Sequence, residues 1–230
     1  MSVKMANKSL EQQISIAVRH FWQTRNEQHL SQGSRTGQRD TGNRTAATGG
    51  KQLDGFRRVF VEALRGVGVP AECIFTDGRA FVTLPGYFRP TKQWDLLVVF
   101  EQKLLAAIEL KALCGPSFGN NYNNRVEEAL GSSTDIWTAY REGLFGQSPK
   151  PFVGYVLLLE ESVRSLAPVE TSNLHFPVPT SFQKASYAVR CEETVRRMVL
   201  ERCYDAGAFI LSERESGSKG FIVNLLLTCR

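Results

Sequence analysis

The stretch WDLLVVFEQKLLAAIELKAL (Trp94–Leu113) determines how this chain is expected to fold. Two apolar segments, residues 94–100 and 104–112, flank the polar turn Glu101–Lys103, which is the pattern of a β-hairpin. If the turn is centred on Gln102, Asp95 lies opposite Glu109, because each stands seven residues from the centre. The two carboxylates are then expected to have Cβ atoms about 5 Å apart.

Three ionisable residues interrupt these otherwise apolar strands: Asp95, Glu109 and Lys111. Glu109 and Lys111 are two positions apart, so their side chains share one face of the sheet. The other face, which is expected to turn toward the core, carries Ile108, Leu110 and Ala112. The pattern therefore predicts that two carboxylates and one amine converge on a single site.

Such a site suits a divalent cation. Two carboxylates about 5 Å apart repel each other unless a positive charge compensates them. Mg²⁺ prefers oxygen ligands and keeps several waters, so one or two carboxylates suffice to bind it. A neighbouring lysine can position or activate a water molecule and stabilise charge on a phosphate. The alternative is a structural ion network in which Lys111 only pairs with the two acids. Glu101 and Lys103 repeat the E-x-K pattern, but they lie in the turn and are excluded.

Working outward from the hairpin, hydrophobic periodicity predicts a mixed α/β architecture. Helices are expected over residues 8–29, 54–64, 125–144 and 181–204, and further strands over 73–75, 80–84, 152–159, 208–212 and 220–227. The helix 125–144 connects strands 104–112 and 152–159, so these two strands should be parallel. We therefore expect one domain over residues 1–230, built on a mixed β-sheet flanked by helices. No glycine-rich phosphate loop follows a strand, so neither a Rossmann nor a P-loop nucleotide site is predicted.

The excess positive charge is confined to the first third of the chain. The formal net charge is +5, but residues 1–66 carry 11 Lys or Arg against 5 Asp or Glu. Residues 31–51 have no apolar period and are rich in Gly, Thr, Ser and Arg, which predicts a flexible basic loop. A polyanionic partner would explain this charge, and the alternative is a solubilising surface.

Two segments are candidate DNA contacts. The first is the basic loop, and its arginines and lysine suit phosphates or guanine edges: Arg35, Arg39, Arg44 and Lys51. The second is the Gly/Asn-rich segment 115–124, which is expected to be a loop, together with the residue that follows it. Its candidate contacts to bases are Asn120, Asn121, Asn123 and Arg125. Both segments are also compatible with ordinary loops, and Asn124 is expected to cap the following helix.

The composition indicates a folded, reduced protein. Of the 230 residues, 42% are hydrophobic, which is enough for a sizeable core. No apolar run approaches the ~18 residues of a membrane span, and the N-terminus lacks the apolar region of a signal peptide. The five cysteines are irregularly spaced and accompany three histidines, so neither a disulfide framework nor a zinc site is predicted. We therefore expect a cytoplasmic location.

The residues of the hairpin belong to a recognisable motif. The segment from Pro90 to Lys111 resembles the PD-(D/E)XK nuclease motif, with Pro90 as a displaced proline. Three longer stretches resemble the XhoI family of type II restriction endonucleases: DTGNRTAATGGKQLDGF (Asp40–Phe56), LPGYFRPTKQWDLLV (Leu84–Val98) and GPSFGNNYNNRVEEALGSSTDIW (Gly115–Trp137). The resemblance runs from about residue 8 to residue 228.

This resemblance implies a homodimer that uses Mg²⁺ to cut double-stranded DNA at the palindrome CTCGAG, leaving 5′ overhangs. It also implies a methyltransferase that protects the same site in the host. Asp95 and Glu109 would be metal ligands together with the Leu110 carbonyl, and Lys111 would be the catalytic lysine. Many enzymes of this class add a helical acid, and Glu62 is the candidate here. The alternatives are a structure-specific repair or recombination nuclease on the same fold, and a DNA-binding protein without catalysis.

Overall fold

The fold was analysed in a computed structural model of the chain, which describes residues 9–36, 50–171 and 175–229. The described residues divide into two compact units. The N-terminal unit contains the residues up to Gly68 together with Arg214–Ile222, and the sheet unit contains Val69–Glu213 and Val223–Arg230. The prediction of a single domain over residues 1–230 stays a prediction.

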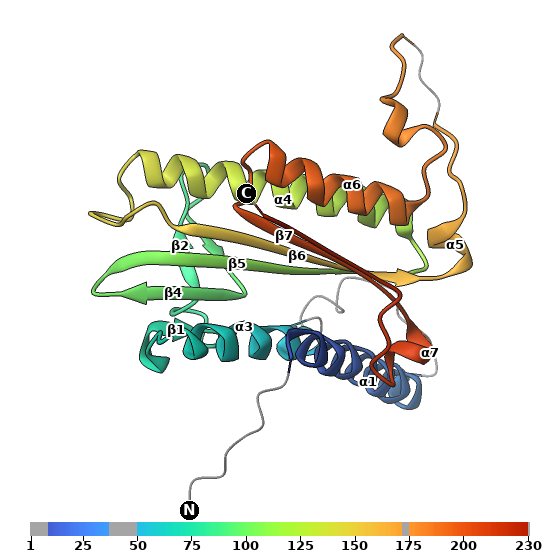
Figure 1. Cartoon of the computed structure of the whole chain (residues 1–230), viewed down its shortest axis with the longest axis horizontal. Helices are drawn as coiled ribbons and strands as arrows, with labels where there is room; N and C mark the ends of the chain where they lie inside the picture. Colours follow the sequence, from blue (N-terminus) through green and yellow to red (C-terminus); the bar gives the residue numbers. More distant parts are fainter. Residues whose placement is uncertain (1–8, 37–49, 172–174, 230) are drawn as a thin grey trace, which may run out of the picture. The chain divides into compact units, whose positions relative to one another are not determined.

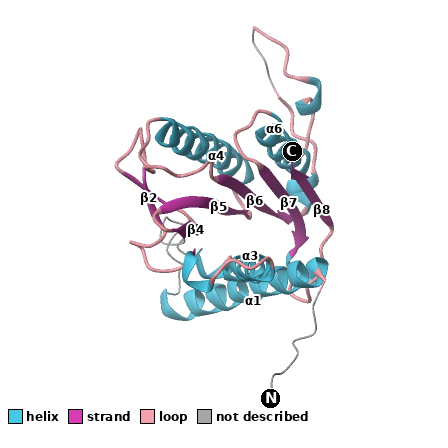
Figure 2. Ribbon diagram, turned by 60° about the vertical axis from the view of Figure 1, so that its left-hand side comes forward, coloured by secondary structure: helices cyan, strands magenta, loops and turns pink. Residues whose placement is uncertain are grey.

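In the described part of the sheet unit, the main sheet has the strand order β1-β4-β5-β6-β7-β8. Its strands are β1 (Ile74–Phe75), β4 (Leu96–Phe100), β5 (Lys103–Leu113), β6 (Phe152–Glu161), β7 (Ala206–Glu213) and β8 (Asn224–Cys229). The strand pairs β5–β6 and β6–β7 are parallel, while β1–β4, β4–β5 and β7–β8 are antiparallel. The predicted mixed sheet and the predicted parallel pair are both confirmed (Figures 1 and 2).

The β4–β5 hairpin closes with a two-residue turn rather than the predicted three-residue turn. Glu101 and Gln102 both have positive φ, 47° and 61°, as type I′ turns require. Leu105 is then an extra residue on β5, because Val98 pairs with Ala106 while Val99 pairs with Leu104. This bulge restores the expected alignment further along the strands, where Leu96 pairs with Ile108. Asp95 directly precedes β4 at the open end of the hairpin, and its N–H donates to the Ile108 carbonyl at 3.1 Å.

Two helices cover one face of the sheet (Figure 1): α4 (Phe118–Arg141) and α6 (Tyr187–Leu200). The helix α4 begins seven residues before the predicted start, so the prediction of a loop over 115–124 is wrong from Phe118 onward, and Asn124 lies inside the helix instead of capping it. Aromatic packing overrides the low helix propensity of asparagine here. Phe118 is buried and stacks on Tyr187 of α6, and the Tyr122 hydroxyl lies 2.9 Å from the Thr194 hydroxyl.

The N-terminal unit contains α1 (Leu10–Thr36), α3 (Asp54–Gly66) and the short α7 (Arg214–Gly217). The predicted loop over 31–51 is wrong at both ends. At its start α1 continues to Thr36, since extending an existing helix adds a hydrogen bond for each residue fixed. At its end Gly50 and Lys51 are helical. The start of α3 packs closely on α1: a Cβ at Gly55 would lie 2.9 Å from the Cα of Ala17. The chain therefore crosses there only because residue 55 has no side chain.

The remaining described elements are short. A separate small sheet pairs β2 (Thr83–Pro85) with β3 (Thr91–Gln93), and the connections contain η1 (Ala71–Cys73), α5 (Val163–Leu166) and η2 (Thr180–Phe182). The strand β3 was not predicted from the sequence. Among the helices of the described ranges, none is both long and apolar enough to cross a membrane.

Candidate active site

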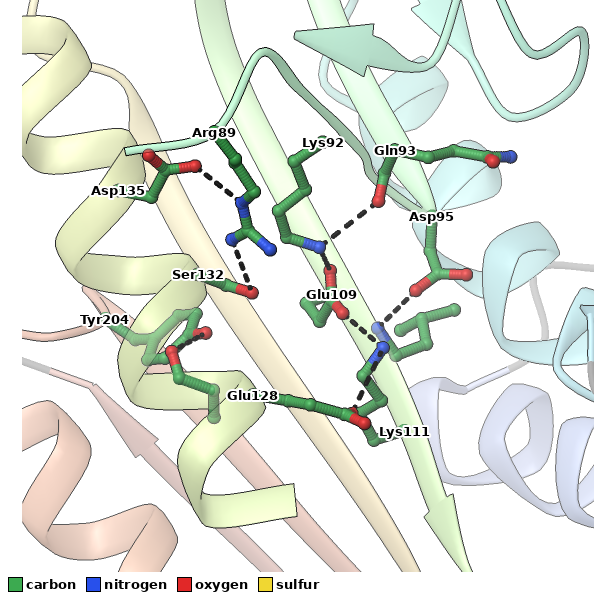
Figure 3. Close-up of polar contacts among 12 residues, drawn as sticks. Arg89, Lys92, Gln93, Asp95, Glu109, Lys111, Glu128, Ser132, Asp135 and Tyr204 are labelled. Atoms are coloured by element: carbon green, nitrogen blue, oxygen red, sulfur yellow. Dashed lines mark hydrogen bonds and ion pairs between the residues drawn. The ribbon is translucent and has the colours of Figure 1, made fainter. Parts of the chain in front are cut away.

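The centre of the site is Glu109, a buried glutamate in the middle of β5. Glu109 is 2% exposed, and a lysine ammonium group contacts each of its carboxylate oxygens. Lys111, two positions along the same strand, pairs with Oε1. Lys92, from β3, pairs with Oε2 at 2.6 Å (Figure 3). The predicted proximity of Glu109 and Lys111 on one face of β5 is confirmed.

The two lysines keep Glu109 ionised despite its burial. Burial by itself raises the pKa of this carboxyl, but the charges of Lys111 and Lys92 outweigh burial and hold the pKa below its usual value. Burial likewise lowers the pKa of Lys111, but Glu109 and Asp95 outweigh it and raise the pKa above the usual value. For Lys92 burial dominates, and its pKa is lowered although Glu109 opposes the shift. Lys111 is therefore an ammonium at neutral pH.

Asp95 lies beside this group, directly before β4. Its Oδ2 accepts a hydrogen bond of 2.8 Å from the backbone N–H of Leu110, the residue between Glu109 and Lys111. Its charge raises the pKa of Lys111, after the larger effects of burial and Glu109. The three residues predicted from the hairpin therefore come together at one place on two adjacent strands (Figure 3). The metal roles of Asp95, Glu109 and the Leu110 carbonyl stay predictions.

The face that carries the site is more buried than expected. Ala107 and Leu113, on the same face as Glu109 and Lys111, belong to the hydrophobic core cluster that α4 and α6 complete. Ile108 and Leu110 on the opposite face are buried as well. The expected burial of Ile108 and Leu110 is confirmed, and Ala112 is half-buried. The burial of the face that carries Glu109 was not anticipated, although strands in a βαβ unit are commonly covered on both faces.

The helix α4 adds a second pair of charges at the edge of the site. Glu128 places Oε2 4.0 Å from the Lys111 Nζ and 2.8 Å from Nη1 of Arg125. Arg125, predicted as a DNA contact from a loop, is therefore a helical residue that is linked to Lys111 through Glu128. Residues 125 and 128 lie on one face of α4, three positions apart, which brings their side chains together.

Asp135, further along α4, fixes the segment that leads into β3. Its Oδ1 accepts hydrogen bonds of 2.8 Å from the N–H groups of both Tyr87 and Phe88. Its Oδ2 accepts from Nε of Arg89, also at 2.8 Å. Burial raises the pKa of Asp135, but these donors outweigh it, and the pKa is below its usual value. A buried carboxylate thus anchors the chain three residues before Lys92 (Figure 3).

The other predicted DNA contacts lie on separate elements or outside the described residues. Asn120 and Asn123 are exposed on α4, and Asn121 is half-buried there. Lys51 is exposed just before α3. Arg39 and Arg44 lie outside the described residues, as does the side chain of Arg35. Glu62 is exposed on α3, and its role as an extra acid stays a prediction.

The donor set fits a divalent cation that takes few protein ligands. In the described ranges no group of three or more His, Cys, Asp or Glu side chains is placed to hold a metal ion. Asp95 and Glu109 supply two carboxylates, and Mg²⁺ requires only one or two because it keeps its waters. Sequence reasoning missed Lys92, Glu128 and the anchor Asp135. The local sequence carries no signal for them, since each reaches its partner from a different element.

Comparisons with known proteins identify the family of the chain. Residues 32–224 match the family model for restriction endonuclease XhoI. The type II restriction enzyme BstVI of Geobacillus stearothermophilus is 50% identical over 187 residues, which cover 79% of this chain and 83% of that protein. The type II restriction enzyme XhoI of Xanthomonas vasicola is 42% identical, covering 81% of this chain and 74% of that protein.

A third relative is the type II restriction enzyme AbrI of Azospirillum brasilense, which is 44% identical over 176 residues and covers 76% of this chain and 77% of that protein. No solved structure matches the chain. The family match spans most of the sequence, including Asp95, Glu109 and Lys111. The chain therefore belongs to the XhoI family of type II restriction endonucleases.

Proposed function

We propose that this chain is a Mg²⁺-dependent endonuclease that cuts double-stranded DNA at the palindrome CTCGAG. The observation that carries the proposal is the buried carboxylate of Glu109, which pairs with Lys111 and lies one strand away from Asp95. A palindromic site suits a homodimer in which each subunit cuts one strand, and we include this assembly in the proposal. A methyltransferase that modifies the same site would protect the host DNA.

Each residue of the site would have a distinct role in hydrolysis. Asp95 and Glu109 would hold the cation, with the Leu110 carbonyl as a third ligand. The cation, when bound, supplies Lewis-acid stabilisation of the charge that develops on the phosphate. The hydrogen bond from the Leu110 N–H orients Asp95, and the lysine pairs orient Glu109. Such fixed orientation reduces the reorganisation that the reaction requires.

Lys111 would contact the reacting phosphate and the attacking water. Its side chain is 22% exposed while it is paired with Glu109, so part of it is accessible to a ligand. The water oxygen forms a bond to phosphorus and loses a proton, while the bond from phosphorus to the 3′ oxygen breaks. The 3′ oxygen takes up a proton, which leaves 5′-phosphate and 3′-hydroxyl ends. Cuts staggered across the palindrome would leave 5′ overhangs.

The location proposed for this reaction is the cytoplasm, where the host DNA and its methyltransferase are found. All five cysteines lie in the described part of the chain, and none of them forms a disulfide. This state is the one expected in a reducing compartment.

One digest tests the proposal. A plasmid with a single CTCGAG site is incubated with the protein in Mg²⁺ or in EDTA, and the ends are mapped by sequencing. We expect one Mg²⁺-dependent cut inside CTCGAG. Discrete cutting at another sequence would overturn the specificity, and tight binding without cleavage would overturn the nuclease assignment. Size-exclusion chromatography with light scattering tests the homodimer.

The chain contains its own matched control for the catalytic residues. Glu101 and Lys103 repeat the E-x-K spacing of Glu109 and Lys111, but both are exposed, Glu101 in the hairpin turn and Lys103 at the first position of β5. We expect E109Q and K111M to reduce cleavage by at least about a hundredfold, as loss of general catalytic groups typically does. The variants E101Q and K103M should cleave as the unmodified protein does. Equal effects on both pairs would contradict the assignment of the site.

A further inference from the structure

A second lysine, Lys92, forms an ion pair with the carboxylate of Glu109 at the centre of the site. Lys92 comes from β3 of the small sheet, not from the strands that carry the nuclease motif. Its Nζ lies 2.6 Å from Oε2 of Glu109, 3.2 Å from the Gln93 carbonyl and 4.5 Å from the ring centre of Trp94 (Figure 3). The side chain is 10% exposed. Lys92 is therefore held in place at Glu109 and is not a loosely attached surface lysine.

The contacts leave Glu109 with both oxygens engaged by ammonium groups, Oε1 by Lys111 and Oε2 by Lys92. A metal ion that uses this carboxylate must share or displace one of them. Lys111 has two further acids nearby, Asp95 and Glu128, which raise its pKa. Lys92 has Glu109 as its ion-pair partner, so displacement of Lys92 exposes an ammonium that needs a new anion.

The net charge of the site also indicates that metal binding needs an additional anion. The two carboxylates of Asp95 and Glu109 are matched by the two ammonium groups of Lys92 and Lys111, so these four side chains are neutral together. Glu128 offers little compensation, because Arg125 pairs with it at 2.8 Å. A divalent cation would give this largely buried group an excess of positive charge, which is costly away from water. A DNA phosphate would supply the missing negative charge.

We propose that Lys92 is a positioning residue that holds Oε2 of Glu109 and thereby makes metal binding depend on bound DNA. When DNA arrives, the phosphate takes over the ammonium of Lys92, and Glu109 is released to the cation. Because coupling between two ligands is reciprocal, the cation also strengthens DNA binding by the same factor. This inference rests on the proposed function, since it requires Glu109 to be a metal ligand.

The test measures Mn²⁺ binding by electron paramagnetic resonance, without DNA and with a cleavage-resistant phosphorothioate duplex that carries CTCGAG. We expect the unmodified protein to bind Mn²⁺ at least about tenfold more tightly with the duplex than without it, within the usual range of coupling. The variant K92M should bind Mn²⁺ at least about tenfold more tightly than the unmodified protein when DNA is absent, because one competing charge is gone. The duplex should then improve binding by K92M much less.

Two further variants separate this role from a structural one. K92R keeps the charge and should retain weak Mn²⁺ binding without DNA. K150M is the matched control, because Lys150 also pairs with a carboxylate, Asp205 at 2.8 Å, and lies 4.9 Å from the ring centre of Trp137. It should bind Mn²⁺ as the unmodified protein does. Thermal denaturation of each variant identifies any that fail to fold, in which case K92Q replaces K92M.

The outcomes distinguish the two levels of the proposal. If K92M binds Mn²⁺ no more tightly than K150M while E109Q abolishes binding, the metal site stands and the role of Lys92 is overturned. If E109Q binds Mn²⁺ as the unmodified protein does, the metal assignment to Glu109 fails, and the inference about Lys92 fails with it. Tighter binding by K92M, lost again in K92R, supports the inference.

Discussion

Replacement of Asp135 by asparagine tests how the segment before β3 is held. Asn keeps one oxygen that can accept from the N–H groups of Tyr87 and Phe88, but it loses the charge and presents an amide to Arg89. Hydrogen bonds to a charged group contribute roughly 1.5–3 kcal/mol each, more than neutral ones. The Arg89 pair counts for less, because the Arg89 side chain is 43% exposed.

From these contacts we expect D135N to lower the free energy of unfolding by about 2–3 kcal/mol at pH 7. For a chain of this size each kcal/mol shifts the melting temperature by about 2–4 °C, so the expected loss is about 4–12 °C. Thermal and urea denaturation followed by circular dichroism measure it. Asp77 is exposed, and D77N should stay within about 0.5 kcal/mol of the unmodified protein.

The pH dependence provides the stricter test. The pKa of Asp135 is lower in the folded state than in the unfolded chain, so its ionised form stabilises the fold at neutral pH. This contribution is complete above the unfolded value of about 3.9 and is lost as the pH falls through the lower folded value. The difference between the unmodified protein and D135N should therefore shrink on acidification below pH 4. Equal stability at pH 7, or a difference that grows in acid, would refute the reasoning.

Three further variants are checked by the same urea denaturation. G86A should lower the free energy of unfolding by about 1–3 kcal/mol, because a Cβ at Gly86 would lie 2.5 Å from Oδ2 of Asp135. Unchanged stability would mean that the backbone at Gly86 is not closely packed against Asp135. Y204F should cost about 1–2 kcal/mol, since the buried phenol donates to a carbonyl of α4 at 2.8 Å; no loss would show that the hydrogen bond contributes nothing net. The double variant E101N/Q102G should stabilise by about 1 kcal/mol, because both turn positions, Glu101 and Gln102, have positive φ. A loss of stability there would contradict the turn geometry.

Local patterns predicted the central sheet well and some of the connections poorly. Alternation along residues 94–113 placed Asp95 opposite Glu109, and the β-bulge at Leu105 preserved that alignment although the turn is one residue shorter than expected. The Asn-rich start of α4 and the last turns of α1 were predicted as loops and are helical. For α4 the cause is visible, because Phe118 and Tyr122 pack against α6.

The partners of the site residues were beyond sequence reasoning. Lys92 lies in a three-residue strand that is too short for any periodicity to be read. Glu128 and Asp135 lie on the helix after β5, and their partners are separated from them by 17 and about 46–48 residues. Such contacts depend on how the elements pack, and packing is a property of the whole sheet unit.

The sequence by itself determined which side chains come together in the candidate site. The period of two in a β-strand places Glu109 and Lys111 on one face, and hairpin pairing brings Asp95 to them, so short-range rules sufficed. The tertiary structure alone decided the electrostatic environment of that site. It buries Glu109, brings Lys92 onto its second oxygen and sets Arg125 and Glu128 beside Lys111. The physical reason is that burial and charge pairing depend on distances between elements remote in sequence, which no local pattern encodes.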